Sequence, residues 1–310
     1  MDTLHRRAFV SLAATTLPFA IGAALPPIPI IDTHIHLFDP TRPQGVPWPP
    51  KNDPVLYKPA LPARYEKLAG PLGVVGAIEI EASPWLEDNQ WVLDVAAQSP
   101  MIVGTVGDLE PGNPEFRQQF ERFHRNPLFR GIRYGNLWDR NLSARLAEPS
   151  FIADLKILAQ ADLVLDTANP DTALIENVVR LTDKIPDLRI VIDHLPSLRV
   201  PTEKRARTGY EADLHRLGER PQVYVKVSQV LQCPNRQEVL DQLWNVFGED
   251  RLLYGSDWPN SDPHGTYKEV LSAVRNYFGN KGRKAEEKYF WRNSVAAYRW
   301  AKRDPKQPSV

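Results

Sequence analysis

The chain has 310 residues, of which 42% are hydrophobic and 25% are charged, and its 38 basic residues balance its 38 acidic ones. This composition is that of a globular protein with a sizeable core, and zero net charge argues against a protein that binds nucleic acid through its phosphates. Cys233 is the only cysteine, which excludes an internal disulfide and a thiolate metal cluster. The length allows two ordinary domains or one large barrel.

The first 25 residues have the layout of an export signal rather than of a folded segment. Arg6 and Arg7 precede a run of apolar and small residues at 11–25, and the pair followed by Phe and Val resembles a bacterial twin-arginine signal. A retained membrane anchor is disfavoured, because about 16 mildly apolar residues fall short of the ~20 that span a bilayer. We therefore interpret residues 1–25 as a twin-arginine-like signal peptide, and we expect residues 26–310 in the periplasm or outside the cell.

After residue 25 the sequence alternates between short β-branched runs and longer amphipathic ones. Strands are predicted at 28–37, 74–82, 102–109, 129–135, 163–168, 189–195, 222–228 and 252–257. Helices are predicted at 86–99, 115–125, 150–161, 171–185, 210–217, 237–247, 267–278 and 284–302. Eight strands alternating with eight helices predict an α/β fold, a closed (β/α)₈ TIM barrel. No change in composition divides residues 26–310, so we expect a single domain.

Three of the predicted strands end in polar motifs. The run Asp-Thr-His-Ile-His at 32–36 ends the first strand, and His34 and His36 point to one face because strand side chains alternate. Two imidazoles so placed can bind one divalent cation. His194 ends the sixth strand and Asp257 ends the eighth. Each motif alone has an ordinary structural explanation. Strands one and eight are neighbours in a closed barrel, however, and barrel enzymes keep their active sites at this carboxyl edge.

Together these fragments resemble the amidohydrolase superfamily, and more narrowly its amidohydrolase-2 branch. That branch includes sugar lactonases of the L-fuconolactonase type, pyrone-dicarboxylate lactonases and some decarboxylases. The most specific part of the resemblance is the run Phe-Gly-Glu-Asp-Arg-Leu-Leu-Tyr-Gly-Ser-Asp-Trp-Pro at 247–259. The similarity extends over nearly all of residues 26–310. It implies a TIM barrel that hydrolyses a C–O or C–N acyl bond.

Two strand ends differ from the binuclear members of the superfamily. Arg133 ends the fourth strand, where those members carry a bridging Lys or Glu, and the fifth strand has no His. An arginine has no lone pair to give to a cation, so a binuclear centre is not expected. The resemblance leaves two possibilities open. One is a single divalent metal, Zn or Mn, held by His34, His36 and Asp257, and the other is metal-free catalysis; we favour the single metal.

The catalytic roles follow from this arrangement. Asp257 is the expected general base, because it is the carboxylate nearest the histidine pair, and the resemblance implies that His194 orients the water or the carbonyl. A lactone is preferred over an amide, since an ester alkoxide leaves more readily than an amide nitrogen. The predicted function is that of an exported lactonase acting on a sugar or related small-molecule lactone. The alternatives are a metal-dependent decarboxylase of the same branch and a periplasmic sugar-binding barrel without turnover.

Substrate contacts are predicted from strand ends, from strand alternation and from the loops that follow strands. Arg133 can form two hydrogen bonds to a carboxylate or to sugar hydroxyls, and three tryptophans follow strands one, four and eight. The predicted substrate-binding residues are Glu81, Arg133, Trp48, Trp138, Trp258 and Tyr224. By the same alternation, Asp32, Glu79 and Lys226 are expected to form an ion network deeper in the barrel.

Proline is unusually frequent, with 29 residues, of which eleven fall between Pro26 and Pro62. Proline fixes φ and lacks an N–H group, so this segment is predicted to form a stiff, extended loop after the first strand. The loop carries Trp48 and Tyr57. We expect it to lie across the mouth of the barrel and to form one wall of the active site.

Overall fold

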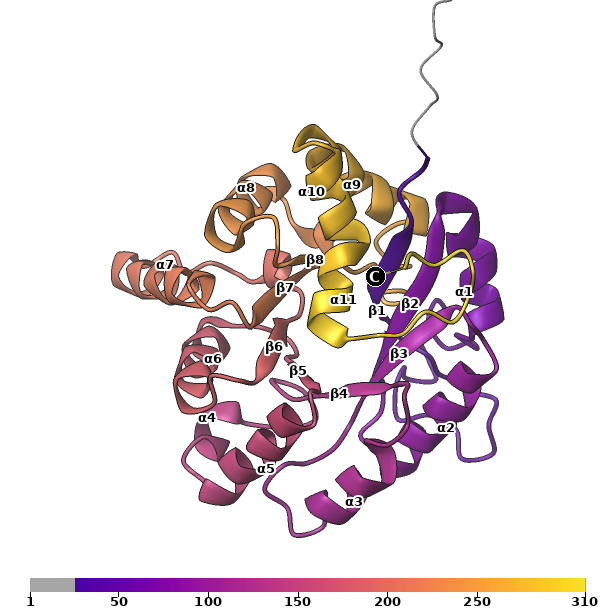
Figure 1. The fold of residues 1–310 in the computed structure, drawn as a ribbon, viewed down its shortest axis with the longest axis horizontal. Helices are drawn as coiled ribbons and strands as arrows, with labels where there is room; N and C mark the ends of the chain where they lie inside the picture. Colours follow the sequence, from indigo (N-terminus) through magenta and orange to yellow (C-terminus); the bar gives the residue numbers. More distant parts are fainter. Residues whose placement is uncertain (1–25, 310) are drawn as a thin grey trace, which may run out of the picture.

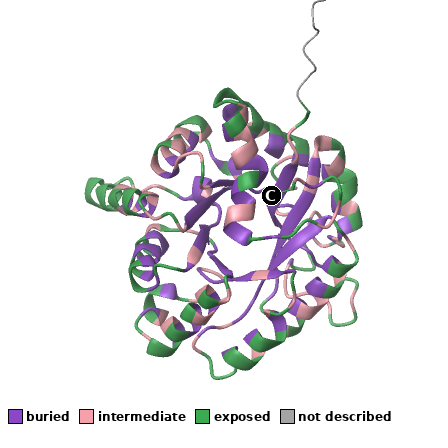
Figure 2. Cartoon of the chain, in the orientation of Figure 1, coloured by how far each residue is buried: buried purple, intermediate pink, exposed green. Residues whose placement is uncertain are grey.

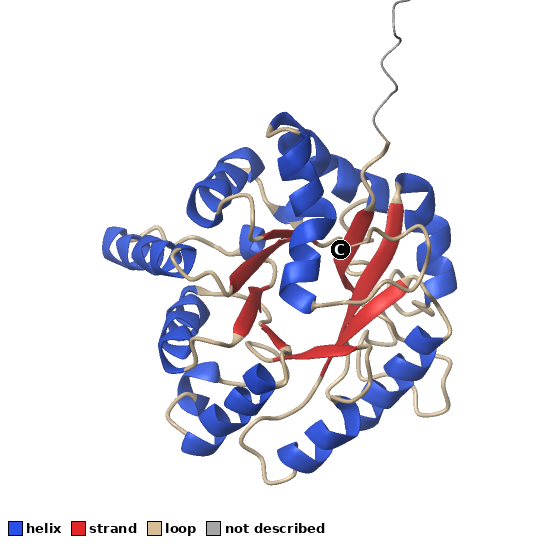
Figure 3. Ribbon diagram, viewed as in Figure 1, coloured by secondary structure: helices blue, strands red, loops and turns tan. Residues whose placement is uncertain are grey.

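The computed structural model describes residues 26–309, so the predicted signal peptide lies outside the described residues and export stays a prediction. Eight parallel strands form one sheet in the order β1 to β8, and helices surround it (Figures 1 and 3). The predicted (β/α)₈ barrel is therefore confirmed. No helix within residues 26–309 is both long enough and apolar enough to cross a membrane.

All eight predicted strands are present, each within its predicted range. The strands are β1 (Ile30–Ile35), β2 (Val74–Ile80), β3 (Ile102–Gly107), β4 (Phe129–Arg133), β5 (Val164–Asp166), β6 (Arg189–Ile192), β7 (Val223–Val227) and β8 (Leu252–Tyr254). The α-helices are α1 (Pro62–Ala69), α2 (Leu86–Ala97), α3 (Phe116–Phe123), α4 (Leu142–Arg145), α5 (Pro149–Gln160), α6 (Thr172–Lys184), α7 (Lys204–Gly218), α8 (Arg236–Phe247), α9 (Tyr267–Asn280), α10 (Arg283–Glu287) and α11 (Asn293–Tyr298).

Two layers of apolar packing hold the barrel together (Figure 2). The larger one lies between the strands and the surrounding helices. The smaller one fills the inside of the barrel with residues such as Ile31, Ile78 and Leu253, joined by Tyr298 and Trp300 from the C-terminal segment. Parallel strands are buried on both faces, which explains why their sequences are nearly continuous apolar runs. Helix α11 crosses one end of the barrel in Figure 1 and closes its amino-terminal side.

The barrel closes between β1 and the residues that follow β8. The backbone N–H of Asp257 donates to the carbonyl of His34 over 2.9 Å, and the N–H of His36 donates to the carbonyl of Trp258 over 2.8 Å. These two bonds lie at the carboxyl edge of the barrel. The backbone alone therefore places the predicted ligands His34, His36 and Asp257 side by side.

Simple alternation fails in β1. Its register with β2 shifts between Asp32 and Ile35, and Ile31 and His34, three residues apart, both face the barrel interior. A bulge of this kind inserts one residue and reverses the alternation beyond it. Asp32 consequently faces the helices, where its Oδ2 accepts hydrogen bonds from the hydroxyls of Tyr65 and Tyr267, both over 2.8 Å.

The predicted ion network of Asp32, Glu79 and Lys226 is therefore wrong. Asp32 and Lys226 lie on opposite faces of the sheet, and Glu79 lines a narrow crevice under the loop after β1. Lys226 is fully buried inside the barrel and pairs instead with Asp166 of β5 and with Asp193, which follows β6.

The proline-rich segment after β1 is a loop at the mouth of the barrel, as predicted, but of Trp48 and Tyr57 only Trp48 lines the cavity. It has no regular element before α1 apart from one bridge between Phe38 and Ala60. Its Trp48 lies beside His36, with ring centroids 6.1 Å apart, and lines the cavity at the mouth of the barrel. The wall predicted for Trp48 is present. Tyr57 is not among the residues that line this cavity.

Candidate active site

A cavity of about 250 Å³ opens at the carboxyl ends of the strands. It is lined by His36, Trp48, Glu81, Ala82, Arg133, Leu137, Trp138, Asn169, His194, Gln229 and Asn260. Four of the six predicted substrate-binding residues, Glu81, Arg133, Trp48 and Trp138, are in this lining. The cavity combines two indoles, three carboxamides and few charges, a surface that suits a small hydroxylated molecule.

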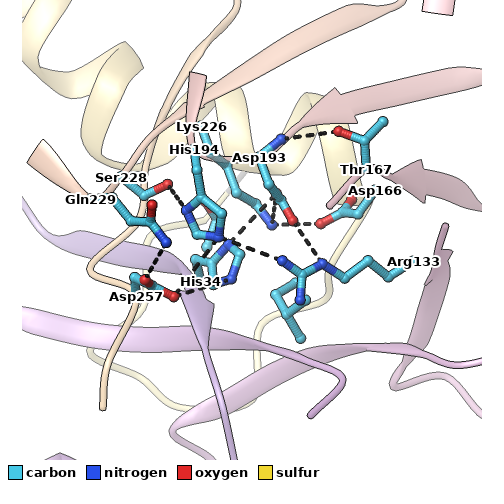
Figure 4. A network of polar contacts seen from close by, with 12 residues as sticks. His34, Arg133, Asp166, Thr167, Asp193, His194, Lys226, Ser228, Gln229 and Asp257 are labelled. Carbon is cyan, nitrogen blue, oxygen red and sulfur yellow. Dashed lines mark hydrogen bonds and ion pairs between the residues drawn. The ribbon is translucent and has the colours of Figure 1, made fainter. Parts of the chain in front are cut away.

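Asp257 lies behind the lining of this cavity, among three histidines, of which Figure 4 labels His34 and His194. Its Oδ1 atom is 3.3 Å from Nε2 of His36, 3.6 Å from Nε2 of His34 and 3.9 Å from Nε2 of His194. Asp257 and His34 have no exposed surface, and the other two histidines are nearly buried. The three predicted motifs thus converge on one carboxylate, as the closed barrel required.

Burial favours the neutral forms of His34 and His194. Desolvation lowers the pKa of His34 well below its ordinary value, and it lowers the pKa of His194 to about 4. Burial alone would raise the pKa of Asp257, but the neighbouring His194 and the contact with His36 outweigh it, so this pKa lies below its usual range. At neutral pH the site therefore holds an ionised carboxylate beside the neutral imidazoles of His34 and His194.

These residues fit one divalent metal ion. One ligand atom each from His34, His36 and Asp257 lie within 4.8 Å of one another, and both ring nitrogens of His34 are buried without a hydrogen-bond partner. Nδ1 of His36 donates to the carbonyl of Ile80 over 2.8 Å, which leaves its Nε2 as the ligand atom. Three protein ligands with one open position are typical of catalytic zinc. A bound metal would lower the pKa of a coordinated water and polarise a carbonyl.

A second metal ion is disfavoured by the neighbouring charges. His34, Asp193 and His194 also form a compact group of potential ligands. However, Asp193 accepts a hydrogen bond from Nε of Arg133 over 3.1 Å and lies 3.0 Å from the ammonium of Lys226. Two cations already neutralise this carboxylate, so a further cation would be repelled.

Arg133 and Glu81 form the charged wall of the cavity. A terminal nitrogen of Arg133 lies 3.7 Å from Glu81 Oε1, and another lies 3.5 Å from Nε2 of His194. The indole N–H of Trp138 donates to Glu81 Oε2 over 3.1 Å. Burial raises the pKa of Glu81 to about 8, although Arg133 opposes this shift. Arg133 already pairs with the ionised Asp193 over 3.1 Å, so its charge is not free to bind an anionic substrate.

Below the histidines, Lys226 lies between two carboxylates (Figure 4). Burial raises the pKa of Asp166 to about 7 against the effect of Lys226, whereas Lys226, His34 and Arg133 together overcome burial and hold the pKa of Asp193 well below normal. Asp193 Oδ1 in turn lies 3.6 Å from Nδ1 of His34. Asp166 ends β5 and Asp193 follows β6, and these positions at strand ends are the sequence signal for both residues.

Tyr224 and Trp258 are wrong as substrate-binding residues. Tyr224 is the second residue of β7, and it lines a separate surface hollow with Pro221 and Arg251 at the amino-terminal end of the barrel. Strand alternation predicts which face of the sheet Tyr224 occupies, but not how far it lies from the carboxyl end of the barrel. Trp258 has no exposed surface and packs on Tyr65, with ring centroids 5.2 Å apart. It lies outside the cavity lining, because Asp257 before it has a left-handed backbone with φ 60°.

Sequence reasoning missed the carboxamides of the site. Asn169, Gln229 and Asn260 line the cavity from the segments after β5, β7 and β8. Nε2 of Gln229 donates to Asp257 Oδ2 over 3.0 Å, and Nδ2 of Asn260 lies 3.3 Å from Asp257 Oδ1. An amide after a strand is common in turns, so their sequence offered no signal beyond their position at strand ends.

Comparison with known proteins agrees with this geometry. The family model described as amidohydrolase matches residues 31–300. An L-fucono-1,5-lactonase of Burkholderia ambifaria is 27% identical over 264 residues, which cover 81% of this chain and 84% of that protein. An L-fucono-1,5-lactonase of Burkholderia multivorans is 23% identical over 86% of this chain and 94% of its own length. The crystal structure of an amidohydrolase from Burkholderia multivorans with bound zinc has the same fold, with a TM-score of 0.76 and 22% identity over 88% of this chain and all of that one. With its family model matched from the first strand to beyond the last, this chain belongs to the amidohydrolase family.

Proposed function

We propose that this protein is a lactonase that opens a neutral, hydroxylated lactone, such as a sugar lactone, by attack of an activated water. The observation that carries the proposal is the buried Asp257, ionised and surrounded by three histidines, two of which line the cavity beside it. The two relatives named L-fucono-1,5-lactonase support the substrate class.

The residues of the site divide the work of hydrolysis. Asp257 Oδ1 takes a proton from the attacking water, and His194, whose Nε2 lies 3.9 Å from that oxygen, helps to orient the water. We propose one divalent metal, Zn or Mn, at His34, His36 and Asp257, and the zinc in the related structure supports this choice. A metal held by these three residues would polarise the lactone carbonyl.

The charge of the cavity favours a neutral substrate. Among the described lining residues Arg133 is the only permanent cation, and it faces Glu81 and Asp193. Arg140, behind it, pairs with Asp108 and Glu110. A dicarboxylate would need an unpaired cation in the cavity, because a buried anion without a partner is strongly disfavoured. A sugar ring instead needs hydroxyl partners and apolar faces, which the carboxamides and indoles supply.

A panel of substrates tests this proposal. We expect kcat/KM for neutral aldono-1,5-lactones to exceed that for a pyrone dicarboxylate by about 100-fold or more, because the dicarboxylate finds no free cation. Proton release, followed with a pH indicator and corrected for spontaneous hydrolysis, measures both. Carbon dioxide evolution from a carboxylated aromatic compound would support the decarboxylase alternative. Sugar binding without proton release from any lactone would support the non-catalytic barrel.

We also propose that the protein acts after export, on the basis of the arginine pair at Arg6 and Arg7. The double change Arg6→Lys and Arg7→Lys preserves the charge of this segment. We expect it to leave the protein in the cytoplasm, because twin-arginine export depends on the arginines themselves. Immunoblots of periplasmic and cytoplasmic fractions measure the distribution. Equal export of wild type and double variant would contradict the twin-arginine interpretation.

A further inference from the structure

The backbone is strained around the cavity. Eight non-glycine residues within 26–309 have left-handed φ angles, and five of them belong to the active site. These five are Trp138, Asn169, His194, Gln229 and Asp257, with φ between 47° and 60°. A left-handed conformation is unfavourable for a residue with a Cβ, and such strain persists only where the surrounding structure enforces it. Its concentration at the carboxyl ends of β4 to β8 indicates side chains held in place for a purpose.

Gln229 shows what the strain achieves. Strand β7 lies between β6 and β8, and Ser228 after it points into the barrel, where its Oγ is 2.7 Å from Nδ1 of His194. In an extended chain the next side chain would point away from the barrel. Gln229 instead adopts φ 53° and ψ 29°, and its side chain also turns into the site. Ser228 and Gln229, which follow β7, therefore contact His194 after β6 and Asp257 after β8.

The contact made by Gln229 gives the two carboxylate oxygens of Asp257 different surroundings. Nε2 of Gln229 donates to Oδ2 over 3.0 Å (Figure 4), and Oδ1 is the atom that faces the three histidines. This is the single side-chain hydrogen bond of Gln229 within residues 26–309. Its side chain is half-buried and lines the cavity. Neither packing nor a role in the turn accounts for an amide aimed at the proposed base.

We propose that Gln229 is a positioning residue for the lactone hydrolysis proposed above. Its carboxamide fixes the carboxylate of Asp257 so that one oxygen is satisfied and the other is directed at the water and the histidines. The left-handed backbone at Gln229 is the strain that this placement requires. Only the identity of the reaction rests on the proposed function. The placement of Asp257 by Gln229 does not depend on that function.

Comparison of Gln229→Ala with Gln229→Gly tests the proposal, because both remove the amide but only glycine relieves the strain. We expect kcat to fall about tenfold to a hundredfold in both, with a smaller change in KM. We expect the Tm of the glycine variant to lie about 2 °C above that of the alanine variant. A merely structural role would predict that the glycine variant recovers turnover together with stability.

Arg299 offers a matched control. It has φ 53° at the end of α11, far from the cavity, and its side chain is exposed. Arg299→Gly should likewise have a higher Tm than Arg299→Ala, and both should keep wild-type kcat. Wild-type turnover in either Gln229 variant would overturn the proposal, as would a glycine variant that regains turnover.

Crystal structures of wild type and Gln229→Gly provide a readout that needs no substrate. We expect the Asp257 carboxylate to rotate or to become disordered when the amide is absent. An unchanged carboxylate would overturn the positioning role. If wild type opens no lactone while the carboxylate of the variant moves, the proposed function fails and the role of Gln229 stands.

Discussion

Replacement of Asp257 by Asn is expected to lower kcat for lactone opening by about 10³-fold while the barrel remains folded. Asparagine has the same shape, and its Oδ1 can still accept the hydrogen bond from Gln229. Its amide nitrogen then occupies the position of the carboxylate oxygen that lies 3.3 Å from His36 and 3.9 Å from His194. That nitrogen cannot take a proton from water, so the general base is lost. Initial rates of proton release at saturating lactone measure the effect.

Asp262→Asn is the matched control for this variant. Asp262 follows the same strand and pairs with Arg64 over 2.9 Å, outside the cavity lining. We expect it to retain wild-type kcat. Thermal unfolding and metal analysis of both variants separate a loss of the base from a loss of fold or of metal. A fully folded Asp257→Asn protein with near wild-type turnover would exclude Asp257 as the base.

The strands could be predicted because a strand buried on both faces leaves a strong mark on its sequence. Each is a short apolar run between turn residues, and all eight appear within their predicted ranges. Helix α1 is not among the predicted helices, and it begins at Pro62, the last proline of the segment predicted to be a loop. Proline is well tolerated in the first turn of a helix, where its missing N–H would have no partner. Helix α7 begins six residues earlier than predicted, at Lys204, because Glu203 caps it by accepting from two backbone N–H groups.

The site was predictable to the extent that the barrel topology determines it. Closure of the sheet brings β1 and β8 together, so the convergence of His34, His36 and Asp257 followed from their positions at strand ends. Where a side chain points depended on local backbone geometry that the sequence does not display. The bulge in β1 turned Asp32 outward. The left-handed residue Gln229 turned its own side chain inward, against the alternation of β7.

Replacement of Lys226 by Met is expected to lower the free energy of unfolding by about 3–5 kcal/mol. Lys226 has no exposed surface and pairs with Asp166 and Asp193, which are also fully buried. Methionine has a similar length and preserves the packing, but it leaves the two carboxylates without their shared cation. Urea denaturation at pH 8 measures the loss. The double variant Lys226→Met with Asp166→Asn should recover most of it, because Arg133 still pairs with the remaining Asp193.

The pH dependence of this loss identifies its cause. Burial already raises the pKa of Asp166 to about 7 with Lys226 present, and without Lys226 it rises further. Below pH 7 both folded proteins bind a proton that the unfolded chain releases near pH 4, but wild type releases it at about pH 7 and the variant only at a higher pH, so the variant loses stability relative to wild type as the pH rises above 7. We expect the deficit relative to wild type to be small near pH 5 and largest near pH 8. A deficit independent of pH would instead indicate defective packing.

The double variant also tests whether Lys226 affects the active site. Because Asp193 lies 3.6 Å from His34, a double variant that regains stability but not turnover would show that Lys226 acts on the site through Asp193.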